Sequence, residues 1–143
     1  MLILHDIAKE EMIADALAAF PDECCGFLFG EEEGDERIIT AIQAVNNVKE
    51  GDKTRRFEIA PQDYLEAERF AAQNGLQLLG IYHSHPDHPS FPSEHDRVAA
   101  QPYFSYIIVS VIRGNWSDTR SWRLNDEHQF EEEVISDYQL IKN

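Results

Sequence analysis

Four of the six histidines in this chain lie within residues 83–96, together with three prolines and three acidic residues. The residues just before this window, 77–82, are largely apolar and free of proline, so they predict a β-strand over residues 77–84. Alternate residues of a strand share a face, so His83 and His85 point the same way. Their Cα atoms would lie about 7 Å apart, close enough for both imidazoles to bind one metal ion.

A third metal ligand is expected from the far side of a stiff loop. Three prolines within residues 86–92 fix their own φ and favour extended geometry in the residues before them. Ser93 then suits the N-cap of a short helix, which places Asp96 in the first helical turn, where a carboxylate is favoured. From there Asp96 can approach the two histidines. Two histidines and one carboxylate leave a fourth position for water, as in catalytic zinc sites, whereas the plainer alternative is a histidine-rich surface loop.

The spacing of these residues resembles the signature of the JAMM (MPN+) metallopeptidases, which is His-x-His, seven residues, Ser, two residues, Asp. Upstream, residues 21–30 read Pro-Asp-Glu-Cys-Cys-Gly-Phe-Leu-Phe-Gly, which resembles the segment of that family that carries the catalytic glutamate. The resemblance spans about residues 8–124. Gly-Ile-Tyr-His at residues 80–83 is similar to the compact bacterial and archaeal branch of the family.

The resemblance implies a role for each residue of the signature. One zinc ion per chain would be held by His83, His85 and Asp96. Glu23 would take a proton from the attacking water and pass it to the leaving amine. Ser93 would supply its hydroxyl to the oxyanion of the tetrahedral state. A role of Ser93 as a helix N-cap only is the alternative, and the two roles are compatible.

Other polar residues of the window fall outside the signature. His88 and His95 are candidates for extra metal ligands. The favoured interpretation is that each is exposed to solvent or contacts a metal-binding side chain without binding the metal itself. Glu94 and Asp87 compete for the acidic roles, and their spacing disfavours both. The sequence therefore predicts Asp96 as the carboxylate ligand.

The two cysteines, Cys24 and Cys25, are adjacent and cannot join distant parts of the fold. We expect reduced thiols in a reducing compartment. A nucleophilic thiol, with a histidine of the cluster at residues 83–95 as its base, is the competing interpretation. Both cysteines lie in an apolar predicted strand, and a buried cysteine in such a strand is usually an inert small hydrophobic residue.

The polar loop over residues 46–54 precedes a short predicted strand over residues 55–59. In similar family members this region borders the substrate groove. Arg55 and Arg56 are therefore candidates for contact with an acidic or carboxylate-bearing substrate. In so acidic a chain, an ion pair with one of its own carboxylates is the favoured interpretation.

Composition excludes several classes of protein. The length of 143 residues and the hydrophobic content of 43% predict one globular domain over residues 1–143. A net charge of −15 argues against binding to nucleic acid or an anionic membrane, because phosphate would be repelled. No apolar run approaches the roughly 20 residues that span a bilayer, and the N-terminus lacks a basic segment. We therefore expect a cytoplasmic protein.

The remaining pattern predicts the fold class. The expected elements are a helix over 7–19, strands over 24–30 and 37–45 around an exposed turn at 31–36, a helix from Pro61 to a C-cap at Asn74–Gly75, a short helix from Ser93 to about Ala100, and strands over 104–111 and 119–124. The tail at 127–141 fits helix and strand equally. This order predicts an α/β (α+β) protein with a single mixed β-sheet flanked by helices. The resemblance implies a JAB1/MPN-like (cytidine-deaminase-like) fold.

The resemblance also implies a substrate class. Larger relatives cleave isopeptide bonds after the Gly-Gly tail of ubiquitin, with insertions for which this chain has little room. Small bacterial relatives act on ubiquitin-like sulfur-carrier proteins and release a group, cysteine in one known type, from the C-terminal glycine. We therefore expect a zinc-dependent metallo(iso)peptidase that hydrolyses the bond after a C-terminal Gly-Gly. The alternative is a non-catalytic MPN-type interaction scaffold that has lost the metal.

Overall fold

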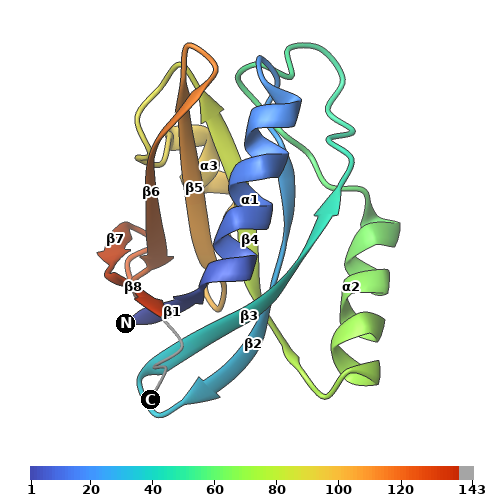
Figure 1. Cartoon of the computed structure of the whole chain (residues 1–143), viewed down its shortest axis with the longest axis vertical. Coiled ribbons are helices and arrows are strands. Elements are labelled where there is room, and N and C mark those ends of the chain that lie inside the picture. Colours follow the sequence, from blue (N-terminus) through green and yellow to red (C-terminus); the bar gives the residue numbers. More distant parts are fainter. Residues whose placement is uncertain (139–143) are drawn as a thin grey trace.

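The computed structural model describes residues 1–138, which form one mixed eight-stranded sheet with helices on both faces (Figure 1). The strand order is β7-β6-β5-β4-β2-β3-β1-β8. In chain order the strands are β1 (Leu2–His5), β2 (Cys25–Glu33), β3 (Glu36–Val45), β4 (Gln77–Pro86), β5 (Ser105–Ile112), β6 (Asn115–Leu124), β7 (Phe130–Glu133) and β8 (Ile135–Tyr138). The helices are α1 (Asp6–Ala19), α2 (Pro61–Gln73) and α3 (Glu94–Ala99).

Helix α1 lies across one face of the sheet, in front of it in Figure 1. Its buried residues, Ala8, Met12 and Ala16, recur every four positions and so line one side of the helix. They pack on a core that includes Leu28, Leu79, Tyr82, Ile107 and Val109. Burying the Met12 side chain contributes about 1.5–3 kcal/mol, so Met12 is the main apolar contact of this stripe with the sheet.

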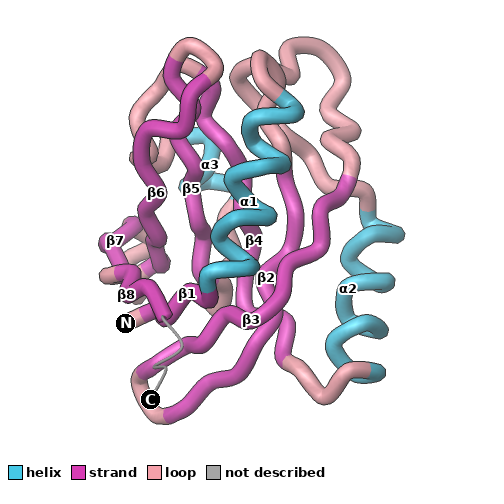
Figure 2. The backbone as a smooth tube through the Cα atoms, in the orientation of Figure 1, coloured by secondary structure: helices cyan, strands magenta, loops and turns pink. Residues whose placement is uncertain are grey.

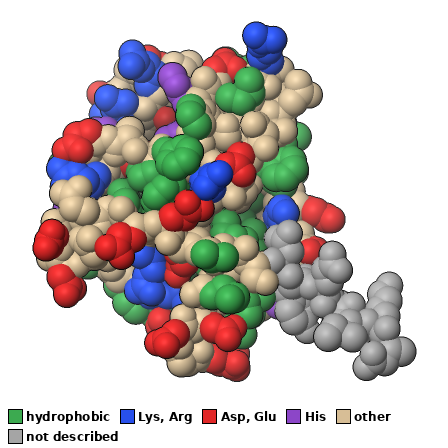
Figure 3. Space-filling model, turned by 90° about the vertical axis from the view of Figure 1, so that its left-hand side faces the viewer, with side chains coloured by type: hydrophobic (Ala, Val, Ile, Leu, Met, Phe, Trp, Pro, Cys, Tyr) green, Lys and Arg blue, Asp and Glu red, His purple; other side chains and the backbone are tan. Residues whose placement is uncertain are grey.

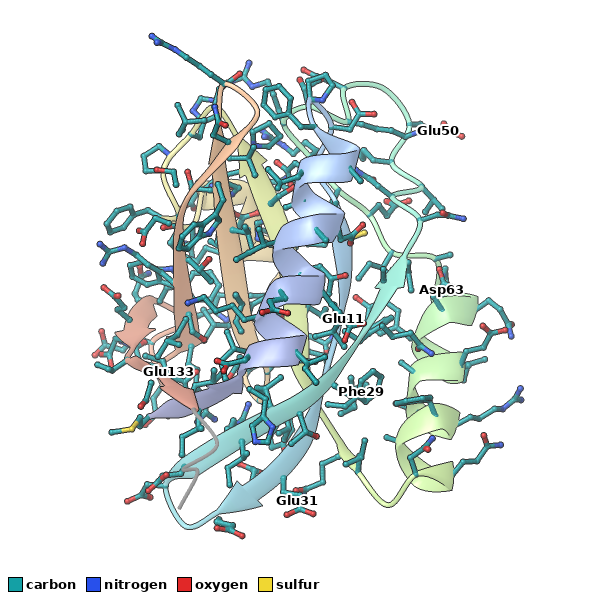
Figure 4. The ribbon with its side chains drawn as sticks, viewed as in Figure 1. Glu11, Phe29, Glu31, Glu50, Asp63 and Glu133 are labelled. Atoms are coloured by element: carbon teal, nitrogen blue, oxygen red, sulfur yellow. The ribbon has the colours of Figure 1, made fainter. Side chains whose placement is uncertain are left out.

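A second core fills the opposite face, between the sheet and α2. Phe29 of β2 lies 4.8 Å from Phe70 of α2, ring centre to ring centre, and Figure 4 shows Phe29 in the space between these elements. Phe27 packs edge-on against Tyr64 at 5.2 Å. The remaining buried members include Cys25, Ile81, Phe104 and Tyr106. The sheet is therefore covered on both sides, as expected for a mixed sheet flanked by helices.

Strand β4 is central to the site because it is enclosed on both edges and both faces. It pairs antiparallel with β2 and parallel with β5, and its residues 79–86 are all buried. Gly80 permits the close approach of β5, since a Cβ there would lie 2.0 Å from the carbonyl oxygen of Ser105. The carboxyl end of β4 lies at the upper end of the view in Figure 1. Figure 2 shows two long loops at this same end, residues 46–60 and residues 87–93.

Two predicted features are wrong. Residues 55–59 form no strand. The carbonyl oxygen of Arg56 and the N–H of Glu58 are hydrogen-bonded to the side chain of Asn47, so they are not available to pair with a neighbouring strand. The exposed turn predicted at 31–36 shrinks to two residues between β2 and β3, since Glu32 pairs with Arg37 across the hairpin. Gly34 supplies the positive φ of 60° that this tight turn needs.

Other elements extend the sheet beyond its predicted strands. β1 was not predicted. The tail at 127–141, which fitted helix and strand equally, forms β7 and β8 over its described part. Residues 139–143 lie outside the described residues. β6 begins at Asn115, four residues before its predicted start. None of the described helices has the length and apolar character required to cross a membrane.

Candidate metal centre

The two histidines of the signature lie on the last residues of β4. The strand runs to Pro86, two residues beyond the predicted end, so both His83 and His85 are strand residues and share a face. His83 is paired with Cys25 of β2 on one edge and with Ile108 of β5 on the other. Two neighbouring strands therefore fix the backbone that carries the imidazoles.

Asp96 completes a group of three potential ligands from the first turn of α3. Its Oδ2 lies 3.1 Å from His85 Nε2, and its Oδ1 lies 3.8 Å from His83 Nε2. One ligand atom from each of the three residues falls within 4.8 Å of the others. The structure thus brings together the three predicted ligands, which come from two elements separated by the proline-rich loop.

The surroundings of this group fit a zinc ion. Two imidazole nitrogens and one carboxylate oxygen are the donor set of a catalytic zinc site with an open fourth position. His85 Nδ1 lies 2.9 Å from the carbonyl oxygen of Pro89. This oxygen accepts a hydrogen bond from Nδ1–H, so the proton stays on Nδ1 and Nε2 is free to ligate. His83 is 1% exposed, and its ring stacks on Phe57 with centres 4.5 Å apart. Both rings are therefore held in position from outside the ligand group.

Glu23 borders the group on the side of His83. Its side chain is 5% exposed, and its Oε1 lies 3.4 Å from His83 Nδ1. Neither of these two buried atoms has a hydrogen-bond partner among the described residues. Burying unpaired polar atoms is costly, and a cation with its water beside them would offset that cost. The orphaned atoms therefore agree with the donor set in indicating a metal centre.

The charges of the group stabilise its ionised carboxylate. Burial alone would raise the pKa of Asp96, but the charge of His83 and hydrogen bonds from His85 and the Ser93 amide lower that pKa below its usual range. Burial alone would lower the pKa of His83, and the carboxylates of Asp96 and Glu23 outweigh it and raise that pKa. At neutral pH Asp96 is therefore an anion, as a metal ligand must be.

Ser93 is the N-cap of α3. Its Oγ accepts a hydrogen bond from the backbone N–H of Asp96 at 3.1 Å, and its own N–H donates to Asp96 Oδ2 at 2.9 Å. This reciprocal capping box satisfies two amide groups at the helix start. Because the hydroxyl oxygen acts as the acceptor, its proton is free to be donated elsewhere. The N-cap role is thus observed, and it is compatible with oxyanion binding.

The backbone of Glu23 is held from both sides by the loop over residues 46–60. Its N–H donates to the carbonyl oxygen of Lys53 at 2.8 Å. Its carbonyl oxygen accepts from the side-chain Nδ2 of Asn47 at 3.0 Å. Sequence reasoning did not single out Asn47. The available signal was its position in a polar loop directly after a strand, where asparagine often bonds to nearby backbone.

The competing acids and histidines are placed elsewhere. His88 and His95 are exposed and do not belong to the group of three ligands. Asp87 accepts a hydrogen bond at 2.7 Å from a backbone amide at the turn between β5 and β6. Glu94 forms an ion pair with Arg97 one turn further along α3. The spacing argument for Asp96 is therefore supported.

The thiols are unsuited to nucleophilic attack. Cys24 and Cys25 are both buried and face the two opposite cores of the sheet. Burial raises the pKa of the Cys25 thiol to about 12, and burial raises that of Cys24 as well. A thiol that stays protonated is a poor nucleophile, so the competing cysteine mechanism lacks its reactive species.

Two cavities flank the ligand group. The first, here called the apolar cavity, has a volume of about 280 Å³ and is lined by Lys49, Phe57, Glu58, Ile59, Tyr64, Ile81, His83, His95, Asp96, Ala99 and Tyr106. The second, here called the arginine cavity, has a volume of about 250 Å³ and is lined by Glu23, Arg55, Arg56, His85, His88, Pro89, Phe91 and Ser93. The three ligands thus lie between the two cavities, with Glu23 and Ser93 on the side of the arginine cavity.

The whole arrangement matches a known family. A family model described as prokaryotic homologs of the JAB domain matches residues 5–125. The chain belongs to this family. This JAB-family protein is 30% identical over 137 residues to the CysO-cysteine peptidase of Mycobacterium tuberculosis, across 94% of this chain and 90% of the relative. It is 28% identical over 113 residues to the desampylase of Pyrococcus furiosus, across 79% of this chain and 74% of the relative.

Solved structures agree with the family assignment. The JAB-family chain superimposes on a protein from Desulfitobacterium hafniense with a TM-score of 0.86 and 31% identity, covering 99% of this chain and 96% of that one. A JAB1/MPN domain protein from Archaeoglobus fulgidus gives a TM-score of 0.58 at 17% identity, covering 97% and 98%, and so shares the fold. The predicted family and fold class are confirmed, and the protein is a hydrolase of the JAMM type.

Proposed function

We propose that this JAB-family protein is a zinc-dependent peptidase that cuts after the C-terminal Gly-Gly of a ubiquitin-like or sulfur-carrier protein. The observation that carries the proposal is the convergence of ligand atoms from His83, His85 and Asp96 within 4.8 Å, beside the buried carboxylate of Glu23. The names of the two relatives, CysO-cysteine peptidase and desampylase, support a carrier-protein substrate. One zinc ion per chain would occupy the three ligands.

Residues of the chain supply the remaining chemistry. When bound, zinc lowers the pKa of its water from about 15.7 towards about 7, which makes a nucleophile available at neutral pH. Glu23 takes the proton of that water and passes it to the leaving amine. The hydroxyl of Ser93 donates to the carbonyl oxygen as negative charge develops there, an interaction typically worth about 3 kcal/mol. The capping box fixes the position of Ser93. Its hydroxyl proton remains available for the oxyanion, because the cap uses only the hydroxyl oxygen, as an acceptor.

The apolar cavity suits the end of the carrier. It approaches His83 and Asp96 from the side of α2, opposite to Glu23. Its lining of Phe57, Ile81 and Tyr106 is mainly apolar, and an extended tail could pass along it. Glycines fit such a passage because they lack side chains and bring the backbone close to the metal. The acyl side of the scissile bond therefore belongs in the apolar cavity.

A cleavage assay tests the proposal. The zinc-loaded protein is incubated with a panel of carrier proteins that end in Gly-Gly joined to cysteine or a short peptide, and the products are measured by mass spectrometry. We expect cleavage directly after the second glycine, strong slowing when Gly-Gly is replaced by Ala-Ala, and complete loss with 1,10-phenanthroline. Intact conjugates together with tight binding of one of them would favour the scaffold alternative.

A further inference from the structure

The arginine cavity lies on the side of the leaving group. In the proposed function, Glu23 passes a proton to the leaving amine, and Glu23 lines this cavity and not the apolar one. Ser93, the proposed oxyanion donor, lines it as well. The amine of the released group must therefore sit at this edge, with the rest of that group inside the arginine cavity.

Arg55 and Arg56 place two cations in the cavity that Glu23 and Ser93 also line. The chain carries 27 acidic residues against 12 basic ones, and acidic and basic side chains are interspersed over the face shown in Figure 3. Neither Arg55 nor Arg56 has a carboxylate within 4.0 Å among the described residues, so the predicted ion pair is not formed. Asp52 is the nearby acid: hydrogen bonds from Thr54, and to a smaller extent the charges of both arginines, lower the pKa of its exposed carboxyl. Arginines that do form such pairs are Arg37, Arg97, Arg120 and Arg123. Arg69 and Arg113 likewise form no such pair among the described residues, but neither lines the arginine cavity. The location of Arg55 and Arg56, and not the missing ion pair alone, therefore indicates an anion that binds in this cavity.

The backbone around the two arginines is tied to the site. The side chain of Asn47 donates both to the carbonyl oxygen of Arg56, at 3.1 Å, and to that of Glu23, at 3.0 Å. Nη1 of Arg56 donates to the carbonyl oxygen of Arg55 at 2.8 Å, which leaves the other donors of this guanidinium available. One side chain thus fixes the segment of the arginines relative to the proposed proton shuttle.

We infer that Arg55 and Arg56 bind the α-carboxylate of the released group, so that the substrate is a carrier whose last glycine is joined to the α-amine of an amino acid or short peptide. This inference rests on the proposed function. Arginine pairs with a carboxylate through two parallel hydrogen bonds. In a released amino acid the carboxylate is two bonds from the amine that Glu23 protonates. In a lysine isopeptide the reacting amine is the ε-amine, four methylene groups away from its Cα.

The size of the cavity agrees with a small released group. Its volume of about 250 Å³ falls below the usual range of roughly 300–1,000 Å³ for drug-sized ligands. One or two amino acid residues, with a terminal carboxylate, fit such a space. The cavity is therefore large enough for the released group that the two arginines would bind.

Three matched probes test this inference. Each is the same Gly-Gly carrier, joined to the α-amine of cysteine with a free carboxylate, to cysteine amide, or to the ε-amine of a lysine peptide. Values of kcat/KM from mass spectrometry should favour the free acid over the amide by about tenfold or more, as expected for charge-assisted hydrogen bonds. In Arg55→Gln with Arg56→Gln this ratio should fall towards one, mainly through a higher KM for the acid.

A control variant tests whether the lost preference for the acid comes from the cavity arginines or from the loss of positive charge in general. Arg69 on α2 lies outside both cavities, so Arg69→Gln should keep the preference for the acid. Urea unfolding should verify that the double variant is folded. Equal rates for acid and amide in the unmodified protein, or a preference that survives in the double variant, would overturn the inference and leave the proposed function standing. If no probe is cut, both fail.

Discussion

The side chain of Asn47 makes hydrogen bonds both to the backbone of Glu23, just before β2, and to the backbone of the loop over residues 46–60. Its Nδ2 donates to the carbonyl oxygen of Glu23 at 3.0 Å, and its Oδ1 accepts from the amides of Lys49 and Glu58 at 3.0 and 3.1 Å. These contacts link the start of β2 to the loop that contributes Phe57, whose ring stacks on His83. Asn47 therefore holds the backbone of Glu23, the proposed proton shuttle.

Replacing this residue tests the positioning role. Asn47→Ala removes the donors and acceptor that satisfy backbone groups, so we expect a loss of about 1–3 kcal/mol in the free energy of unfolding. We also expect kcat to fall more than KM changes, because Glu23 is displaced and the zinc ligands are not. Urea unfolding and steady-state kinetics measure both effects. Asn46→Ala, at the exposed neighbouring position, is the matched control, and equal effects of the two variants would contradict the role.

Zinc content tests the ligand assignment. Purified protein should contain about one equivalent of zinc by elemental analysis, and His83→Ala with His85→Ala should remove it, because two of the three ligands are lost. His88→Ala with His95→Ala changes two exposed histidines outside the ligand group and should retain the metal. Full retention of zinc by the first double variant would show that the ligands lie elsewhere.

The proton shuttle can be separated from the metal ligands. Glu23→Gln keeps the size of the side chain and removes its basicity, so zinc content and stability should persist. The rate of hydrolysis should drop by about 10²–10⁴-fold, the usual contribution of a general acid–base group. The half-buried neighbour provides the comparison, since Asp22→Asn should remain active. Near-normal turnover of Glu23→Gln would refute the role and direct attention to Asp22.

The buried thiols predict a loss of stability in alkali. Burial raises the pKa of the Cys25 thiol from 9.0 to about 12. Between these values the unfolded chain releases a proton that the folded chain retains, so the free energy of unfolding falls as the pH rises. Below the lower value this thiol contributes no dependence on pH.

Urea unfolding at about pH 8 and about pH 10.5 measures this loss. Cys25→Ala should lose less stability between the two conditions, because the group responsible is gone. Other buried groups with raised pKa values, such as Tyr82, retain their share of the loss in both proteins. An equal loss in both proteins would mean that Cys25 does not contribute.

The predictable parts of the site depend on short-range geometry. His83 and His85 share a face because strand side chains alternate, and Ser93 with Asp96 forms a cap whose spacing is visible in the sequence. Phe57 lies against His83 only because a loop folds back over the end of β4, and nothing local predicts that contact. Local rules therefore predicted the three residues that the structure brings together, and missed the residues that hold them in place.

The same distinction applies to the fold. Helix α1 follows from a repeating apolar stripe, whereas β1, only four residues long, is a strand because it fits between β3 and β8. The guanidinium of Arg37, fully buried, donates to the Leu79 carbonyl oxygen and the Ser105 hydroxyl, on strands distant in the sequence. Short strands and buried charges of this kind depend on partners that no local window contains.

Asp96 has a consequence for the behaviour of the protein without its metal. Its Oδ2 accepts from the Ser93 amide while facing His85 Nε2, so the carboxylate of the proposed metal site is also half of a helix cap. A helix of six residues has little stability of its own. Chelation should therefore loosen α3 and release Ser93 from its position. Faster amide hydrogen exchange in residues 94–99 after metal removal would report this local opening. The exchange rate of α3 would then depend on whether the metal is bound.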